Sequence, residues 1–137
     1  MFVILLYEFK SKEGERMSNF ESREDYLETI YILSKKGKVR SIDIVNEMHY
    51  SKPSVSIAMK KLKEEGYIEI SDNYITLTSN GLDVASKVYE RHEILAKALV
   101  LLGVNEETAL IDACKIEHDL SEESFSAIKS HLEKFNK

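Results

Sequence analysis

The spacing of apolar residues changes once between residues 22 and 78, and this change limits the folds open to the chain. Before Gly66 apolar residues recur at helical spacing, whereas residues 67–70 and 74–78 are short β-prone runs. The polar residues 71–73 between the two runs are typical of a hairpin turn. The chain is therefore predicted to be mainly α-helical with a small β-hairpin.

Three helices are expected before the hairpin. The first covers residues 24–35 with Ser22 as its N-cap, the short second covers residues 42–48, and the third covers residues 52–65 with Pro53 in its first turn. This order is that of a winged helix-turn-helix. Proteins of this architecture place the third helix in the major groove of DNA.

The charge is unevenly distributed along the chain. Residues 35–63 carry a net charge of +6, although the chain as a whole carries −5. A basic region of this kind suits the phosphates of double-stranded DNA, the predicted partner, although a helical module that binds protein is an alternative. The residues expected to contact DNA are exposed polar or basic groups: Arg40, Ser51, Lys52, Pro53, Ser54, Ser56 and Lys60.

Three more helices are expected after the hairpin, over residues 80–102, 106–119 and 122–135. Asn105 and Ser121 are placed to cap the last two of them. On the first of the three, the polar residues are expected on the side opposite the apolar stripe: Lys87, Glu90, Arg91, Glu93 and Lys97.

Several classes of protein are disfavoured by what the sequence contains. The single cysteine excludes an intramolecular disulfide, so we expect a cytoplasmic protein. The apolar run at residues 2–7 is too short for a membrane span or a signal peptide. There is no Gly-rich phosphate loop, nucleophile elbow or two-histidine metalloprotease signature, so neither an enzyme nor a small organic substrate is expected.

Polar residues on the apolar faces of the C-terminal helices indicate a candidate metal site. Glu117 falls near the centre of the apolar arc of its helix, and Cys114 and His118 share its patch of helix surface. His92 lies within the apolar stripe of the preceding helix. Because a buried carboxylate needs a cation or a proton, this set favours a divalent transition metal. The alternatives are an ion pair of Glu117 with a lysine or arginine, and an ordinary core histidine at position 92.

Two carboxylates on the first helix could complete such a site. Asp25 and Glu28 lie three residues apart on the face opposite its apolar stripe. From the pattern alone, however, Asp25 is interpreted as part of a capping box with Ser22, and Glu28 as a solvated charge.

Four segments resemble the diphtheria toxin repressor and manganese transport regulator family from about Ser22 onward. They are Asp25-Tyr26-Leu27-Glu28-Thr29-Ile30-Tyr31, Lys52-Pro53-Ser54-Val55-Ser56, Arg91-His92-Glu93 and Asp112-Ala113-Cys114-Lys115-Ile116-Glu117-His118. The resemblance implies a homodimeric repressor in which Mn²⁺ or Fe²⁺, with Co²⁺ or Zn²⁺ possible in vitro, bridges the first helix and a dimerisation domain. The implied ligands are Asp25, Glu28, His92, Cys114, Glu117 and His118.

The resemblance also implies the domain organisation. Residues 17–79 would form the winged helix-turn-helix domain. Residues 80–137 would form a long linker helix and a helical domain for metal binding and dimerisation. Residues 1–16 are interpreted as an N-terminal extension.

The chain departs from the family pattern at several positions. Asp25 matches the manganese type, but Cys114 matches the iron type, whereas the manganese type carries a glutamate that helps to bind two ions. Ala96 and Leu110 replace ligands of the iron type's second site, and Ile57 replaces its base-reading glutamine. We therefore expect one principal ion per subunit.

The predicted function is a metal-dependent repressor that binds a palindromic operator and controls metal-ion homeostasis. The alternative is a winged-helix regulator that metal does not control.

Overall fold

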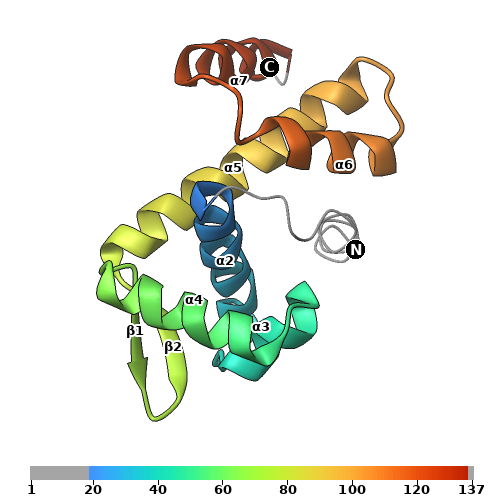
Figure 1. Ribbon diagram of the computed structural model, residues 1–137. Coiled ribbons are helices and arrows are strands. Elements are labelled where there is room, and N and C mark those ends of the chain that lie inside the picture. Colours follow the sequence, from blue (N-terminus) through green and yellow to red (C-terminus); the bar gives the residue numbers. More distant parts are fainter. Residues whose placement is uncertain (1–18, 136–137) are drawn as a thin grey trace. The chain divides into compact units, whose positions relative to one another are not determined.

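The structure is a computed structural model that describes residues 19–135, so the expected extension at residues 1–16 lies outside the described residues. The chain divides into two compact units between Lys87 and Val88. This boundary falls within the long helix α5, Ser79–Leu101 (Figure 1). We describe the N-terminal and C-terminal units separately.

The N-terminal unit contains three helices and a hairpin, as the sequence predicts. The elements are α2 (Asn19–Ser34), α3 (Ser41–Met48), α4 (Lys52–Glu64), β1 (Ile68–Ser71) and β2 (Tyr74–Leu77). Together with the helices of the C-terminal unit, they confirm a mainly helical chain with a two-stranded antiparallel hairpin. The core of this unit is made of apolar side chains from all of its elements, including Leu27, Ile30, Val39, Ile44, Val55, Met59, Leu62, Ile68 and Ile75.

The start of α2 differs from the expectation. Because the helix already includes Asn19, Ser22 lies inside it and is not its N-cap. Residues 19–23 include neither proline nor glycine, so this segment can extend the helix. Consequently Asp25 is an interior helical residue and not part of a capping box.

The turn between α3 and α4 is fixed by local backbone chemistry. His49 ends α3 in the left-handed conformation, with a φ of 56°. The Ser51 hydroxyl then accepts a hydrogen bond from the Ser54 N–H at 3.2 Å, and Pro53 lies in the first turn of α4 as predicted. These features end one helix and begin the next within four residues, which gives a helix-turn-helix.

The hairpin closes through a two-residue turn. Ser71 pairs with Tyr74, and the intervening Asp72 and Asn73 have φ values of 52° and 67°. Two successive positive φ values match a type I′ turn, whose twist suits paired strands. Val39 bridges to Ile75 and so ties the hairpin to the segment before α3.

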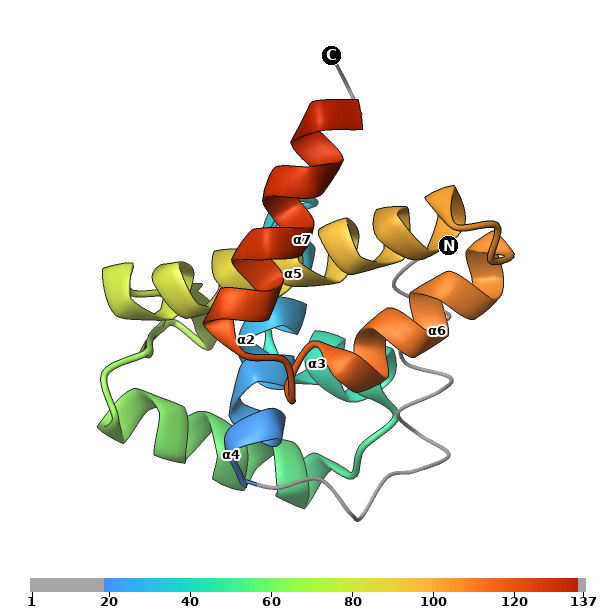
Figure 2. The same cartoon turned by 90° about the horizontal axis from the view of Figure 1, so that it is seen from above.

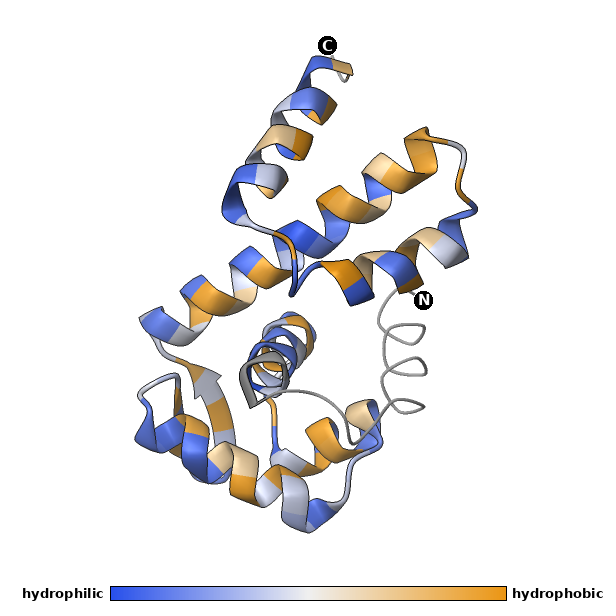
Figure 3. Ribbon diagram, turned by 45° about the horizontal axis from the view of Figure 1, so that its top comes forward, coloured by the Kyte–Doolittle hydropathy of each residue, from blue (hydrophilic) through white to orange (hydrophobic). Residues whose placement is uncertain are grey.

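The C-terminal unit packs the second half of α5 against α6 (Glu106–Ile116) and α7 (Glu122–Phe135). In Figure 2, α6 runs back alongside this half of α5, and α7 crosses it. The last turns of α5 are mostly hydrophobic (Figure 3). The apolar cluster between the three helices consists of Leu95, Ala96, Leu110, Ala113, Leu120 and Ile128.

The caps of α6 and α7 agree with the sequence, but the end of α6 does not. The side chains of Asn105 and Ser121 accept hydrogen bonds from main-chain N–H groups in the following turns, at 3.0 and 3.1 Å. However, α6 ends at Ile116 and not near Asp119. The N–H groups of Asp119 and Leu120 both donate to the Ile116 carbonyl, so the chain closes into a turn there.

No helix in the described part of the chain is long and apolar enough to cross a membrane.

Candidate metal centre and DNA-binding surface

Glu117 and His92 are in contact inside the C-terminal unit. Nδ1 of His92, on α5, lies 2.7 Å from Oε2 of Glu117, which follows the last residue of α6. The two side chains are 0 and 1% exposed. This burial confirms the prediction that both residues face inward. A carboxylate buried to this extent needs a neighbouring positive charge or a strong hydrogen-bond donor.

A second imidazole lies on the other oxygen of the same carboxylate. Nε2 of His118 is 3.2 Å from Oε1 of Glu117, and the His118 side chain is 5% exposed. Cys114 is also buried, one helical turn earlier on α6. The C-terminal unit therefore gathers a carboxylate and two imidazoles, with a buried thiol one turn away. Carboxylate oxygens and imidazole nitrogens are ligands of Mn²⁺, Fe²⁺, Co²⁺ and Zn²⁺, so these donors fit a divalent transition metal.

Asp25 and Glu28 are both buried on α2 in the N-terminal unit, at 1 and 0% exposure. The interpretation of Glu28 as a solvated charge is therefore wrong. The hydroxyl of Thr29 donates to the main-chain carbonyl of Asp25 at 2.7 Å. Burial raises the pKa of the neighbouring Tyr26 to about 12, with smaller contributions from Tyr50 and from the charge of Asp25. A helix of a small domain seldom buries two carboxylates within one turn without a cationic partner.

Arg91 is a residue whose role the sequence did not reveal. Helical periodicity places it on the polar side of α5, yet its side chain is only 19% exposed. Its guanidinium donates to the carbonyls of Glu117 at 2.7 Å and Leu120 at 3.1 Å, and to the carboxylate of Glu122 at 2.9 Å. Such contacts depend on where α6 ends, which periodicity does not predict.

The residues predicted to contact DNA lie on the surface of the N-terminal unit. Ser51, Lys52, Pro53, Ser54, Ser56 and Lys60 are exposed along α4 and its N-terminus, and Arg40 is exposed just before α3. The opposite side of α4 is buried through Val55, Met59 and Leu62. Ile57 is 70% exposed on the same helix, which is unusual for a branched apolar side chain unless a partner covers it.

Two further residues join Arg40 at the hairpin. The Arg40 guanidinium donates to the Tyr74 hydroxyl at 2.8 Å, and its central carbon lies 4.7 Å from the centre of the Tyr74 ring. Nζ of Lys38 also lies 4.7 Å from that centre. Two cations on one aromatic ring concentrate positive charge beside the hairpin. No local sequence pattern pairs Lys38 and Arg40 with a residue as distant as Tyr74.

Two protein-family models, one for each domain of the iron-dependent repressors, together match nearly the whole described chain. The N-terminal DNA-binding domain matches residues 20–73, and the metal-binding and dimerisation domain matches residues 78–137. The chain belongs to the diphtheria toxin repressor and manganese transport regulator family. It is a metal-dependent, DNA-binding transcriptional repressor, and the dimerisation domain indicates a homodimer.

Relatives of similar length support this assignment. An uncharacterised HTH-type transcriptional regulator of Methanocaldococcus jannaschii is 35% identical over 119 residues, which are 84% of this chain and 95% of that protein. The transcriptional regulator MntR of Bacillus subtilis is 36% identical over 117 residues, which are 83% and 82% of the two chains.

Solved structures of family members have the same fold. ScaR with bound Cd²⁺ is 30% identical, with a TM-score of 0.73 over 81% of this chain and 53% of that one. A manganese-dependent transcriptional repressor in complex with manganese is 27% identical, with a TM-score of 0.70 over 80% and 51%. The chain thus spans about half the length of these solved proteins.

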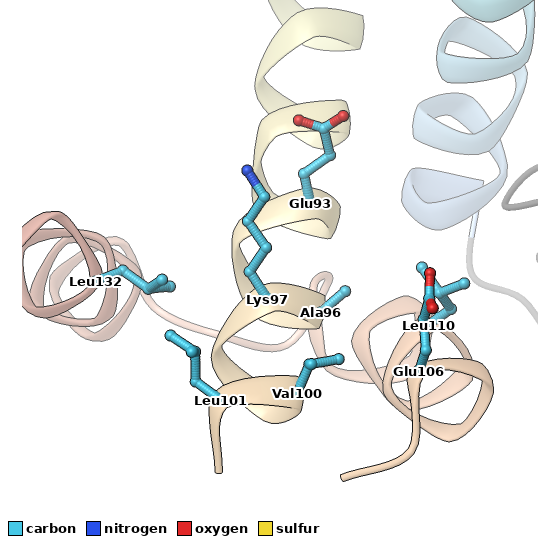
Figure 4. A pocket seen from close by; sticks show the side chains of 8 residues that line it. All are labelled: Glu93, Ala96, Lys97, Val100, Leu101, Glu106, Leu110 and Leu132. Atoms are coloured by element: carbon cyan, nitrogen blue, oxygen red, sulfur yellow. The ribbon is translucent and has the colours of Figure 1, made fainter. Parts of the chain in front are cut away.

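Ala96 and Leu110, which the family resemblance places at two positions of the iron type's second metal site, are apolar. Both line a cavity of about 430 Å³ whose walls come from α5, α6 and α7 (Figure 4). Glu93 and Glu106 also line the cavity, together with Lys97. Ala96 belongs to the apolar cluster and is 7% exposed. Neither Ala96 nor Leu110 has a side-chain donor atom for a metal ion.

Proposed function

We propose that Mn²⁺ or Fe²⁺ is the corepressor and that one principal ion binds per subunit. The ligands would be Asp25 and Glu28 of α2 together with His92, Cys114, Glu117 and His118. The observation that carries the proposal is the Glu117 carboxylate, which is buried with an imidazole within 3.2 Å of each of its oxygens. The burial of Asp25 and Glu28, which the sequence pattern alone did not predict, adds two carboxylates.

The chemistry of the donors bears on the choice of metal. Three carboxylates are hard ligands and favour Mn²⁺, whereas a thiolate at Cys114 would favour Fe²⁺, Co²⁺ or Zn²⁺. If Cys114 contributed its main-chain carbonyl instead, as the resemblance to the iron type implies, the thiolate preference would be lost. We favour manganese as the physiological metal.

Charge explains how metal controls the repressor. In this proposal, the carboxylates of Asp25 and Glu28 would repel that of Glu117 when no cation is bound, and the two units would be held together loosely. A bound divalent ion supplies the positive charge that lets all three approach. Because this favours one orientation of the units, metal acts through its higher affinity for the DNA-competent state.

The DNA target follows from the dimer. The two α4 helices of a homodimer would enter successive major grooves of a palindromic operator, with Ser51, Ser54 and Ser56 near base edges and Lys60 at a phosphate. We assign residues 17–79 to DNA binding and residues 80–137 to metal binding and dimerisation. Because its target is genomic DNA, we place the protein in the cytoplasm, where it would regulate metal-ion homeostasis.

A mobility-shift assay on the protein's own promoter region tests the proposal. The DNA is titrated with protein in chelator and then in Mn²⁺, Fe²⁺, Co²⁺ and Zn²⁺. We expect tight binding with Mn²⁺ or Fe²⁺ and weak binding in chelator. Equal affinity under all conditions would instead support a winged-helix regulator that metal does not control, in which His92 and Glu117 form a structural ion pair.

A further inference from the structure

Arg91, on α5, contacts main-chain carbonyls after the end of α6 and side chains of α7. One guanidinium nitrogen, Nη1, donates to the carbonyls of both Glu117 and Leu120, at 2.7 and 3.1 Å. The other, Nη2, bonds to the Glu122 carboxylate in the first turn of α7. The central carbon of the guanidinium also lies 5.2 Å from the ring centre of Phe125. The arginine therefore spans the connection between α6 and α7.

The main-chain carbonyls at the end of a helix lack partners within that helix and carry partial negative charge. Nη1 can satisfy two carbonyls at once because it carries two N–H groups whose directions are fixed in the guanidinium plane. Of the three contacts, the ion pair contributes least, since the Glu122 side chain is 81% exposed and its charge is screened by water. The carbonyl contacts are partly buried, so they determine the shape of the turn.

Glu117 is thus held at two points by adjacent residues of α5. Arg91 binds its main-chain carbonyl, and His92 contacts its carboxylate. His118 follows immediately in the same turn, and its imidazole contacts the other oxygen of that carboxylate. A change in the path of residues 117–120 would therefore displace both of these candidate ligands together.

We propose that Arg91 is a positioning residue for metal binding, which sets the main-chain path of residues 117–120 and so aims Glu117 and His118 at the ion. This inference rests on the proposed metal site. Hydrogen bonds that orient ligands from outside the coordination sphere commonly change metal affinity by about 10–100-fold. Arg91 would act in this way through the main chain.

The test compares Mn²⁺ affinity, measured by calorimetry, in the full chain and in variants. Arg91→Met removes the donors but keeps an apolar stem against Phe125, and we expect it to raise the Kd by about 10–100-fold. Arg91→Lys keeps the charge but loses the planar guanidinium with its fixed N–H directions, so its Kd should be intermediate. Lys129→Met is the matched control, because Lys129 on α7 also pairs with α5, through Glu90, but does not contact residues 117–120. Its Kd should stay within about twofold of wild type.

A second readout needs no metal. In the metal-free protein, the amide hydrogens of Asp119 and Leu120 should exchange faster in Arg91→Met than in wild type, because the turn they close has lost its support. The inference is overturned if Arg91→Met binds Mn²⁺ as wild type does, or if Lys129→Met weakens binding equally. Should Arg91→Met fail to fold by circular dichroism, a wild-type Kd in Arg91→Lys would overturn it. Wild-type protein that binds no divalent ion would refute the proposed function itself, and the inference with it.

Discussion

Nδ1 of His92 lies 2.7 Å from Oε2 of Glu117, and both side chains are almost fully buried. The contact joins α5 to the end of α6, although the two residues are 25 positions apart in the sequence. A neutral imidazole could donate one hydrogen bond to this carboxylate but could not neutralise its charge. The buried carboxylate therefore needs a cation, such as a metal ion, or a proton.

Removing the Glu117 carboxylate should abolish metal-dependent DNA binding while leaving the dimer intact. In Glu117→Ala a ligand itself is lost. The Mn²⁺ Kd should therefore rise by more than the roughly 10–100-fold that is typical when a residue that only orients a ligand is removed. Calorimetry gives the Kd, and analytical ultracentrifugation gives the oligomeric state. Asp119→Ala removes an exposed carboxylate two residues away and should leave the Kd unchanged. Unaltered Mn²⁺ binding in Glu117→Ala would exclude this residue as a ligand.

The number of bound ions should depend on Cys114. The wild-type chain is expected to bind one tight divalent ion per subunit. The family resemblance puts Cys114 where the manganese type has a glutamate, and Ala96 and Leu110 where the iron type's second site has two of its ligands. Cys114→Glu restores that carboxylate and should add a second Mn²⁺. The stoichiometry from calorimetry, checked by metal analysis of dialysed protein, decides the point. Two equally tight ions in the wild type would contradict this account.

Lys60 on α4 should contact a phosphate of the DNA backbone. Lys60→Ala is expected to weaken binding to all DNA sequences alike and to flatten the plot of log affinity against log salt concentration. The slope should change by about 0.9 per lysine lost, or about 1.8 for a dimer. Lys87→Ala is the control, since Lys87 is an exposed lysine that pairs with Asp83 on α5. A salt dependence that Lys60→Ala leaves unchanged would remove Lys60 from the interface.

Gly81 in the first turn of α5 should tolerate no side chain. A Cβ at this position would lie 2.0 Å from the main-chain carbonyl oxygen of Tyr67, which also accepts the Thr78 N–H at 3.0 Å. Gly81→Ala should therefore lower the free energy of unfolding by about 1–3 kcal/mol, despite the better helix propensity of alanine. Asn80→Ala, at an exposed neighbouring position, should change it by no more than about 0.5 kcal/mol. Urea denaturation of both variants measures the difference.

The sequence predicted most of the fold because its local signals agree with the tertiary structure. The change of period near Gly66, the proline at the start of α4 and the caps at Asn105 and Ser121 each act within a few residues. The errors lie at helix ends. Ser22 was expected to begin a helix that already includes Asn19, and α6 was expected to continue past Ile116. Propensity places such ends poorly because several nearby residues can cap a helix or continue it.

The candidate site was predicted unevenly for a similar reason. Helical periodicity alone placed Glu117 and His92 inward, because each interrupts an apolar stripe. It could not show that Glu28 is fully buried, since Glu28 lies opposite the apolar stripe of its helix and only tertiary structure covers that face. The family resemblance supplied Asp25 and Glu28 as ligands. Neither pattern nor resemblance indicated the role of Arg91. It binds main-chain carbonyls, which every residue has, so the residue types at positions 117 and 120 do not reveal the contact.

The most direct test of the central claim is the affinity of the wild-type protein for its own promoter DNA, measured by fluorescence anisotropy with chelator and with saturating Mn²⁺. If metal favours the DNA-competent state, Mn²⁺ should tighten binding by about 5–150-fold, the usual range of allosteric coupling. By reciprocity, operator DNA should tighten Mn²⁺ binding by the same factor. Identical DNA affinity in chelator and in saturating Mn²⁺ would contradict the account.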